Sequence, residues 1–184
     1  MDALRKTVLI LVISTPFGAL LGWSAQTFGL RGAGFAFIVT WLSMCWLSLV
    51  GKVIVWRLPA GYYRIRPFER GGRLYRRLGV RILKRLLRRG VMTVFNPTLY
   101  LPAVRDAEGL SRLEREMRAA ETAHVLMFLL ILPVIGHAVI RGWWGAAGWT
   151  LLFDVLINAY PVMLQRYNRD WVGELIARQR PAGR

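Results

Sequence analysis

The sequence predicts an all-α integral membrane protein with four transmembrane helices, and composition and patterning both support this. The 184 residues are 55% hydrophobic, yet Lys and Arg outnumber Asp and Glu by 26 to 10, a net charge of +16. The apolar residues gather in four runs, at 7–28, 34–56, 123–140 and 143–165. Each run is close to the ~20 helical residues that cross a bilayer. We therefore expect a single membrane domain over residues 1–184.

Buried soluble helices and a signal peptide fit the apolar runs less well than membrane spans do. A buried helix of a soluble protein accounts for any one run, but four of them leave too little polar chain to cover them. A cleaved signal peptide accounts for residues 7–28, which follow Arg5 and Lys6. That run is long for a signal peptide, and Gly22-Trp23-Ser24 is a poor cleavage context. We therefore keep the first run as a span.

The distribution of charge predicts the topology. Residues 57–122 hold sixteen Arg or Lys against six Asp or Glu, whereas each of the other two connections holds one basic residue, Arg31 or Arg141. Basic residues stay on the cytoplasmic side of a membrane. The chain start and the tail at 166–184 are also basic. We therefore expect a multi-pass protein of the cell (inner) membrane, with residues 57–122 and both termini in the cytoplasm.

The first part of the central segment, Pro67–Gly90, has the pattern of a basic amphipathic helix. At 100° per residue its apolar side chains fall on one side and its basic side chains on the other. The apolar set is Leu74, Tyr75, Leu78, Ile82 and Leu86, and the basic set is Arg73, Arg77, Arg81, Lys84 and Arg88. Such a helix lies in the membrane surface and binds anionic lipid headgroups. Nucleic acid is not expected as a partner, since nothing here supplies a base-reading fold.

The rest of the central segment is expected to be a loop followed by a helix. Residues 91–107 contain Asn96-Pro97 and Leu101-Pro102, which are turn signals. Ser111, with Glu114 three residues on, has the register of a capping box. We expect a helix from this point into the third span.

Glu121 and His124 are the first candidate catalytic residues. Their i, i+3 spacing lets a carboxylate orient an imidazole, an arrangement used for general-base catalysis. Two alternatives stay open: Glu121 and Arg118 form an interfacial ion pair, and His124 only marks the membrane boundary. Because there is one Glu-x-x-His copy and no Cys/His cluster, we assign no metal and no bound cofactor.

The fourth span carries a polar stripe. Asp154, Asn158 and Gln165 share one side of an apolar helix, and polar groups at that depth face a partner or a cavity. Helix-to-helix hydrogen bonding without a chemical role accounts for Asn158 equally well. Because the third and fourth spans form a hairpin, Glu121 and His124 are expected at the level of 165–169. Those residues offer two amides as oxyanion donors and two arginines for a phosphate-rich donor.

Several of these residues also carry a family resemblance. Gln165-Arg166-Tyr167-Asn168-Arg169, preceded by Asn158 and Tyr160-Pro161, together with Glu116, Glu121 and His124, resembles the glycosyl-4,4'-diaponeurosporenoate acyltransferase family. Upstream, Phe68-Glu69 and Gly72-Arg73-Leu74-Tyr75 are similar to the family's basic segment. The likeness covers about residues 66–172. Arg118 stands one position from the expected family arginine, and Asp154 has no counterpart.

The resemblance implies an acyltransferase that esterifies a sugar hydroxyl of a glycosylated carotenoid acid, or a related glycolipid, with a fatty acyl group. It implies catalytic roles for His124 and Glu121, with an acyl donor such as acyl-CoA as co-substrate. The implied substrate-binding residues are Glu116, Arg118, Asn158, Gln165, Arg166, Tyr167, Asn168 and Arg169. The alternative from another functional class is a non-enzymatic membrane adaptor or anionic-lipid-binding subunit.

Overall fold

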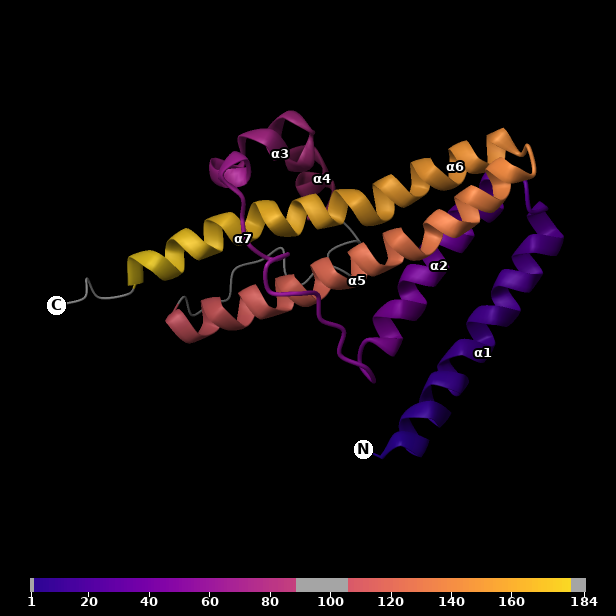
Figure 1. The fold of residues 1–184 in the computed structure, drawn as a ribbon, viewed down its shortest axis with the longest axis horizontal. Coiled ribbons are helices and arrows are strands. Elements are labelled where there is room, and N and C mark those ends of the chain that lie inside the picture. Colours follow the sequence, from indigo (N-terminus) through magenta and orange to yellow (C-terminus); the bar gives the residue numbers. More distant parts are fainter. Residues whose placement is uncertain (1, 89–105, 180–184) are drawn as a thin grey trace. The chain divides into compact units, whose positions relative to one another are not determined.

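The computed structural model describes residues 2–88 and 106–179, and within these ranges every regular element is helical (Figure 1). The long helices are α1 (Ala3–Phe28), α2 (Ala33–Val50), α5 (Ala107–Ile140), α6 (Trp144–Asp154) and α7 (Tyr160–Gln179). The shorter ones are η1 (Pro67–Gly72), α3 (Arg73–Arg77), α4 (Val80–Leu87) and a π-helical turn, η4 (Val155–Ala159). The loop expected at 91–107 lies outside the described residues, except for Asp106 and Ala107.

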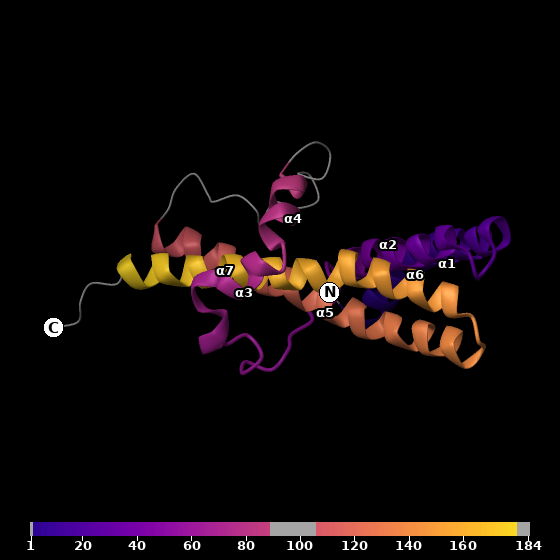
Figure 2. The ribbon, with the colours of Figure 1, turned by 90° about the horizontal axis from the view of Figure 1, so that it is seen from above.

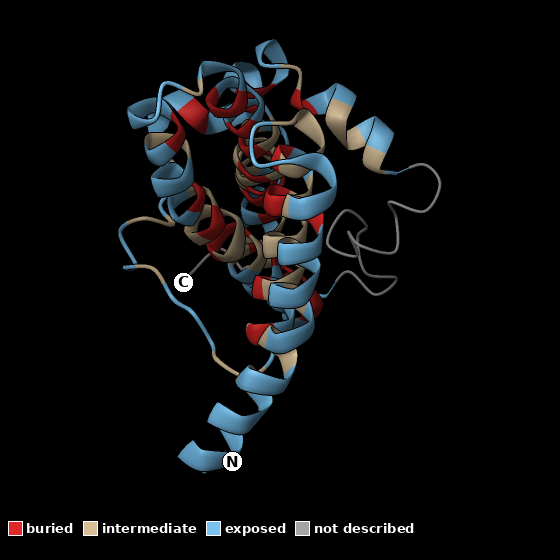
Figure 3. Ribbon diagram, turned by 90° about the vertical axis from the view of Figure 1, so that its right-hand side faces the viewer, coloured by how far each residue is buried: buried red, intermediate tan, exposed pale blue. Residues whose placement is uncertain are grey.

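Within the described ranges, four helices are long and apolar enough to cross a membrane, as the sequence predicts. They are Ala3–Phe28, Ala33–Val50, Ala107–Ile140 and the continuous Trp144–Gln179. In α1, every residue of which the structure describes, Ser24 alone is buried. Figure 3 shows the start of this helix as exposed. An apolar helix that packs so little of its surface inside the protein needs lipid around it.

The chain divides into two compact units, and the first contains residues 1–57 and 123–159. Its core joins Leu47 of α2 to Met127 and Ile131 of α5. A second contact packs the alanines Ala138, Ala146 and Ala147 together. Small residues let helix backbones approach closely, which is how helices associate in lipid. The Trp46 indole also donates a hydrogen bond to Ser14 Oγ at 3.0 Å, which ties α2 to α1.

Several helix boundaries differ from the sequence-based expectation. The second span was predicted to end at residue 56, but α2 ends at Val50 with Gly51 as its C-cap. Helix α5 begins at Ala107, not at Ser111, because the Asp106 carboxylate accepts from the backbone N–H of Gly109 at 2.7 Å. Ser111 Oγ instead donates to the Ala107 carbonyl within the helix. The N-cap predicted at Ser111 is therefore wrong, and Asp106 occupies that role.

The single amphipathic helix predicted over Pro67–Gly90 is also wrong, since three short helical pieces replace it. Gly71, Gly72 and Gly79 adopt positive φ values of 67°, 61° and 77°. This left-handed conformation is open to glycine and ends a right-handed helix. The chain therefore turns between η1, α3 and α4, although the apolar spacing continues through the turns.

The second unit, residues 58–122 and 160–184, packs these short helices along α7 (Figures 1 and 2). Tyr75 and Val80 form a buried cluster with Leu164 of α7. A separate cluster, consisting of Leu110, Leu113, Met117 and Val172, joins the start of α5 to α7. Helix α7 is thus covered on one side by α3 and α4 and on another by residues 107–122.

Replacing Gly72 with alanine is expected to destabilise this unit more than the same change at Gly71. Both glycines have positive φ, so each alanine meets a similar backbone penalty of roughly 1 kcal/mol. A Cβ at Gly72 would also overlap the ring of Tyr167, whereas a Cβ at Gly71 meets open space. We expect Gly72→Ala to lower the free energy of unfolding by about 1–3 kcal/mol more than Gly71→Ala does. Thermal unfolding of both variants in one detergent measures the difference, and equal melting temperatures would contradict this packing.

Candidate active site

The first unit contains a chain of three hydrogen-bonded polar side chains. The Asn158 amide nitrogen donates to Asp154 Oδ1 at 2.8 Å, and Asn158 Oδ1 lies 3.2 Å from His124 Nδ1. Asp154 and Asn158 are fully buried and His124 is half-buried. Because the carboxylate takes the amide N–H, the amide oxygen faces the imidazole. The Nδ1–H tautomer fits this chain, because Nδ1 can donate to the amide oxygen while Nε2 is the basic nitrogen. His124 also has a hydrogen bond with the Ile157 backbone.

Local backbone geometry presents Asn158 for this contact. It lies in the π-helical turn η4, Val155–Ala159, between α6 and α7. A π-helical turn inserts one residue into a helix and re-aims its side chains, and such turns are frequent at functional sites. The polar stripe predicted at Asp154 and Asn158 thus has a defined partner, His124. We call these three residues the histidine relay.

Glu121 has different partners from those expected. Its two oxygens accept from Arg166 Nη1 at 2.9 Å and from Arg169 Nη1 at 2.6 Å, and its side chain is fully buried. The orienting hydrogen bond that we expected from Glu121 to His124 is made by Asn158 instead. The interfacial pair considered between Glu121 and Arg118 is likewise replaced, since Arg118 binds Glu114 at 2.6 Å.

Arg166 is the centre of a buried network in the second unit. Its Nε and Nη2 donate to the two oxygens of Glu69 at 2.6 and 2.7 Å. The remaining N–H groups bind Glu121 and the carbonyls of Tyr62 and Arg64. A guanidinium has five N–H donors, and contacts among the described residues use all five. In this arrangement Arg166 holds the 62–69 segment against α5 and α7 and offers no donor to a ligand.

The same network controls the ionisation of Glu69. Burial by itself would raise the pKa of this carboxyl, but hydrogen bonds from Arg166, Tyr75 and the Arg66 backbone outweigh burial and lower the pKa to about 2. Glu69 is therefore charged at neutral pH. With Glu121, Arg166 and Arg169 it forms a neutral set of two acids and two bases, which is how proteins tolerate buried charge. We call these four residues the ion-pair network.

The other expected substrate-binding residues divide into buried and exposed ones. Asn168 is 3% exposed and accepts from Lys84 Nζ at 2.6 Å, while Gln165 is also buried. Tyr167 lies against Gly72. Arg169 donates to the Tyr63 carbonyl at 2.6 Å as well as to Glu121. Glu116 is exposed on α5.

Two members of these clusters were not among the predicted site residues. Glu69 had a usable signal, since it is the only acidic residue between positions 57 and 105 and must balance many arginines. No role was predicted for Asp154. In the structure it accepts a hydrogen bond from the Asn158 amide and so orients that side chain. Within the described residues, no three His, Cys, Asp or Glu side chains gather as a metal site would require.

The described residues define the class: their regular elements are helices, four of them able to cross a membrane, and they contain an imidazole hydrogen-bonded to a buried amide and a buried network of charged side chains. The family model of glycosyl-4,4'-diaponeurosporenoate acyltransferase matches residues 59–178, more than half of the chain. The chain belongs to this family and is an acyltransferase of the carotenoid pathway. Comparison with curated proteins and with solved structures found no match.

Proposed function

We propose that this enzyme joins a fatty acyl group to a sugar hydroxyl of a glycosylated carotenoid acid, or of a related glycolipid, at the cytoplasmic face of the cell membrane. The observation that carries the proposal is the histidine relay in a chain of this acyltransferase family. The family description provides the reaction class and the acceptor class. The relay provides a base of the kind that acyl transfer to a hydroxyl requires.

In the proposed reaction His124 is the general base. Its Nε2 accepts the proton of the sugar hydroxyl as the oxygen attacks the acyl carbonyl carbon. The bond from that carbon to the donor's leaving group then breaks, and the leaving group takes the proton from the imidazolium. Asn158 and Asp154 orient the ring and favour the Nδ1–H tautomer, in which Nε2 is the basic nitrogen. The acyl donor is a thioester such as acyl-CoA or a lipid ester.

Glu121, Arg166 and Arg169 are assigned a positioning role in this proposal. Since they bind one another and the 62–69 segment, they hold α5 and α7 together within the second unit. Two of the residues expected to touch substrate, Tyr167 and Asn168, line a cavity. We therefore place substrate contacts at these two residues, and not at the network arginines.

Mass spectrometry of lipid extracts tests the proposed function in cells that make a glycosylated carotenoid acid. We expect cells with this protein to contain a species heavier by one fatty acyl group, and cells without it to lack that species. A protein carrying Asn158→Leu, which removes the contact to the His124 ring, should yield much less of it. If the acylated species were equally abundant with and without the protein, the proposal would fail.

The proposed sidedness follows from the charge distribution and has its own test. Cysteines placed at positions 31, 77 and 141 in a Cys45→Ser background report which segments an impermeant reagent reaches in intact cells. We expect labelling at 31 and 141, and labelling at 77 only after the membrane is opened, because the basic segment stays cytoplasmic. Labelling at 77 in intact cells would place the basic segment outside and contradict the proposed cytoplasmic reaction.

A further inference from the structure

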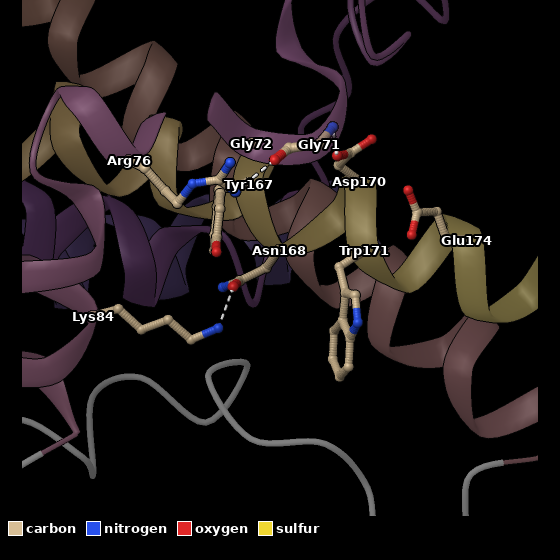
Figure 4. Close-up of a pocket in the computed structure, with 9 residues that line it drawn as sticks. All are labelled: Gly71, Gly72, Arg76, Lys84, Tyr167, Asn168, Asp170, Trp171 and Glu174. Carbon is tan, nitrogen blue, oxygen red and sulfur yellow. Dashed lines mark hydrogen bonds between the residues drawn. The ribbon is translucent and has the colours of Figure 1, made fainter. Parts of the chain in front are cut away.

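A cavity of about 330 Å³ lies in the second unit, where η1, α3 and α4 meet α7. Figure 4 shows the residues that line it. None of its lining residues belongs to the histidine relay or to the ion-pair network. The cavity is at the small end of ligand sites, which hold about 300–1,000 Å³. At ~30 Å³ per water, it holds a group of roughly eleven heavy atoms.

One end of the cavity presents hydrogen-bond donors. Lys84 Nζ donates to Asn168 Oδ1 at 2.6 Å, so the lysine binds the amide oxygen and not the amide nitrogen (Figure 4). That nitrogen is buried and has no hydrogen-bond partner within the part of the chain that the structure describes. A buried amide nitrogen without a hydrogen-bond partner is costly, so the group is expected to have a ligand. Lys84 keeps two further N–H donors and has no carboxylate within ion-pair distance among the described residues.

The other end presents acceptors. Asp170 and Glu174 line it from successive turns of α7. Asp170 Oδ2 accepts from the backbone N–H of Gly71 at 2.8 Å, which fixes the carboxylate. The Glu174 side chain is exposed. Figure 4 shows these two carboxylates at the far side of the cavity from Lys84.

Two aromatic rings complete the lining. Trp171 is 45% exposed although it is large and apolar, and Tyr167 lies against Gly72. An exposed indole beside a cavity offers a flat apolar face with polar groups around it. The indole face can pack against the C–H groups of a polyhydroxyl ring, whose hydroxyls point outward from the edge of the ring.

The charges of the lining determine the class of ligand. Arg76 and Lys84 are positive and Asp170 and Glu174 are negative, so the four sum to zero. A phosphate would meet the two carboxylates, and a cation would meet the lysine and the arginine. A neutral polyhydroxyl ring satisfies both ends, because each hydroxyl donates to one group and accepts from another. A single hexose has twelve heavy atoms, close to the capacity of the cavity.

We infer that this cavity binds the sugar ring of the acceptor, with Asn168 and Lys84 donating to its hydroxyls, Asp170 and Glu174 accepting from them, and Trp171 against its apolar face. The inference rests on the proposed function for the identity of the acceptor. It adds a binding site for the sugar, and its residues are separate from the proposed base.

Binding of methyl β-glucoside to the purified full chain tests the inference without any acyl donor. The protein is held in phosphatidylcholine bilayer discs, so that no glycosidic detergent competes, and binding is measured by saturation-transfer NMR. We expect saturable binding to the unmodified protein. Asn168→Leu removes the amide, including its unpartnered nitrogen, and keeps the side chain nearly the same size. Trp171→Leu removes the indole ring. Each is expected to weaken binding about tenfold, as for the loss of one or two contacts.

The control is Trp144→Leu, which makes the same change at an exposed tryptophan of α6 in the other unit. Its binding should equal that of the unmodified protein. Because Trp171 is an exposed side chain, its variant is expected to fold even if Asn168→Leu does not.

Unchanged binding in Trp171→Leu would overturn the sugar site. Displacement of the glucoside by inorganic phosphate would overturn it in favour of an anion site. If the unmodified protein bound the glucoside but transferred no acyl group, the result would contradict the proposed function and leave the sugar site standing.

Discussion

Replacing His124 with alanine is expected to lower the rate of acyl transfer by roughly 10²–10⁴-fold, the usual contribution of a general base. The imidazole is the group that the relay orients, through the 3.2 Å contact to Asn158 and the 2.8 Å contact from Asn158 to Asp154. Without it, nothing in the relay can take the hydroxyl proton. The measurement is the initial rate of product formation by purified protein in bilayer discs, with membrane insertion and melting temperature recorded for each sample.

His137→Ala is the matched control, since it removes the other histidine of the same helix, which lies against Trp143. It should leave the rate within about twofold of the unmodified protein, as for a surface change. Asn158→Leu should lower kcat more than it changes KM, because it loosens the ring without touching the substrate. A His124→Ala protein that inserts normally and keeps its full rate would show that His124 is not the base.

Replacing Glu121 with glutamine is expected to destabilise the second unit by about 3–5 kcal/mol. The change keeps the shape of the side chain and removes its charge. Among the carboxylates of the described residues, it leaves Arg166 with Glu69 alone, and it leaves Arg169 with only the longer, 3.7 Å contact to Glu114. Such a loss is large because Glu121 and Arg169 are buried, so the positive charge left without its partner is poorly hydrated. Thermal unfolding followed by intrinsic fluorescence in one detergent measures it.

Glu116→Gln provides the comparison on the same helix. Glu116 is exposed, and among the described residues its side chain makes no hydrogen bond or ion pair. The same chemical change there should alter stability by no more than about 0.5 kcal/mol. If Glu121→Gln melted at the temperature of Glu116→Gln, the ion-pair network would not be the element that holds this unit together.

Much of the fold could be predicted from the sequence because membrane spans depend on long apolar runs. Each of the four runs overlaps one of the four candidate spans. The larger differences are at the end of the second span, the start of the third and the end of the fourth. Helix breaks inside the basic segment could not be predicted in the same way. The apolar spacing continues past Gly71, Gly72 and Gly79, so periodicity indicates one helix. The backbone conformation of these glycines instead divides the segment into three short helices.

The candidate site was predicted as a set of residues but not as a set of contacts. Spacing along one helix made His124 the nearest partner of Glu121. In the structure, arginines from α7 reach Glu121, and Asn158 reaches His124. Contacts across helices depend on rotation and register, which the pattern of one helix does not contain. The π-helical turn that carries Asn158 also leaves no distinct pattern in sequence.

A membrane adaptor would also have the apolar helices and the basic segment. That alternative gives no reason for an imidazole hydrogen-bonded to a buried amide that is itself bound to a buried acid. It also gives no reason for a small cavity lined by both donors and acceptors beside Trp171. Family membership and these two features favour an enzyme.

Reconstitution of the reaction with purified protein tests the central proposal most directly. The protein in bilayer discs is supplied with a glycosylated carotenoid acid and a fatty acyl-CoA, and the product is fragmented in a mass spectrometer. We predict a mass gain of one acyl group, carried by the sugar fragment, with far less product from His124→Ala. An acyl group on the carotenoid fragment, or no product from several acyl donors including phospholipids, would contradict sugar acylation by this chain.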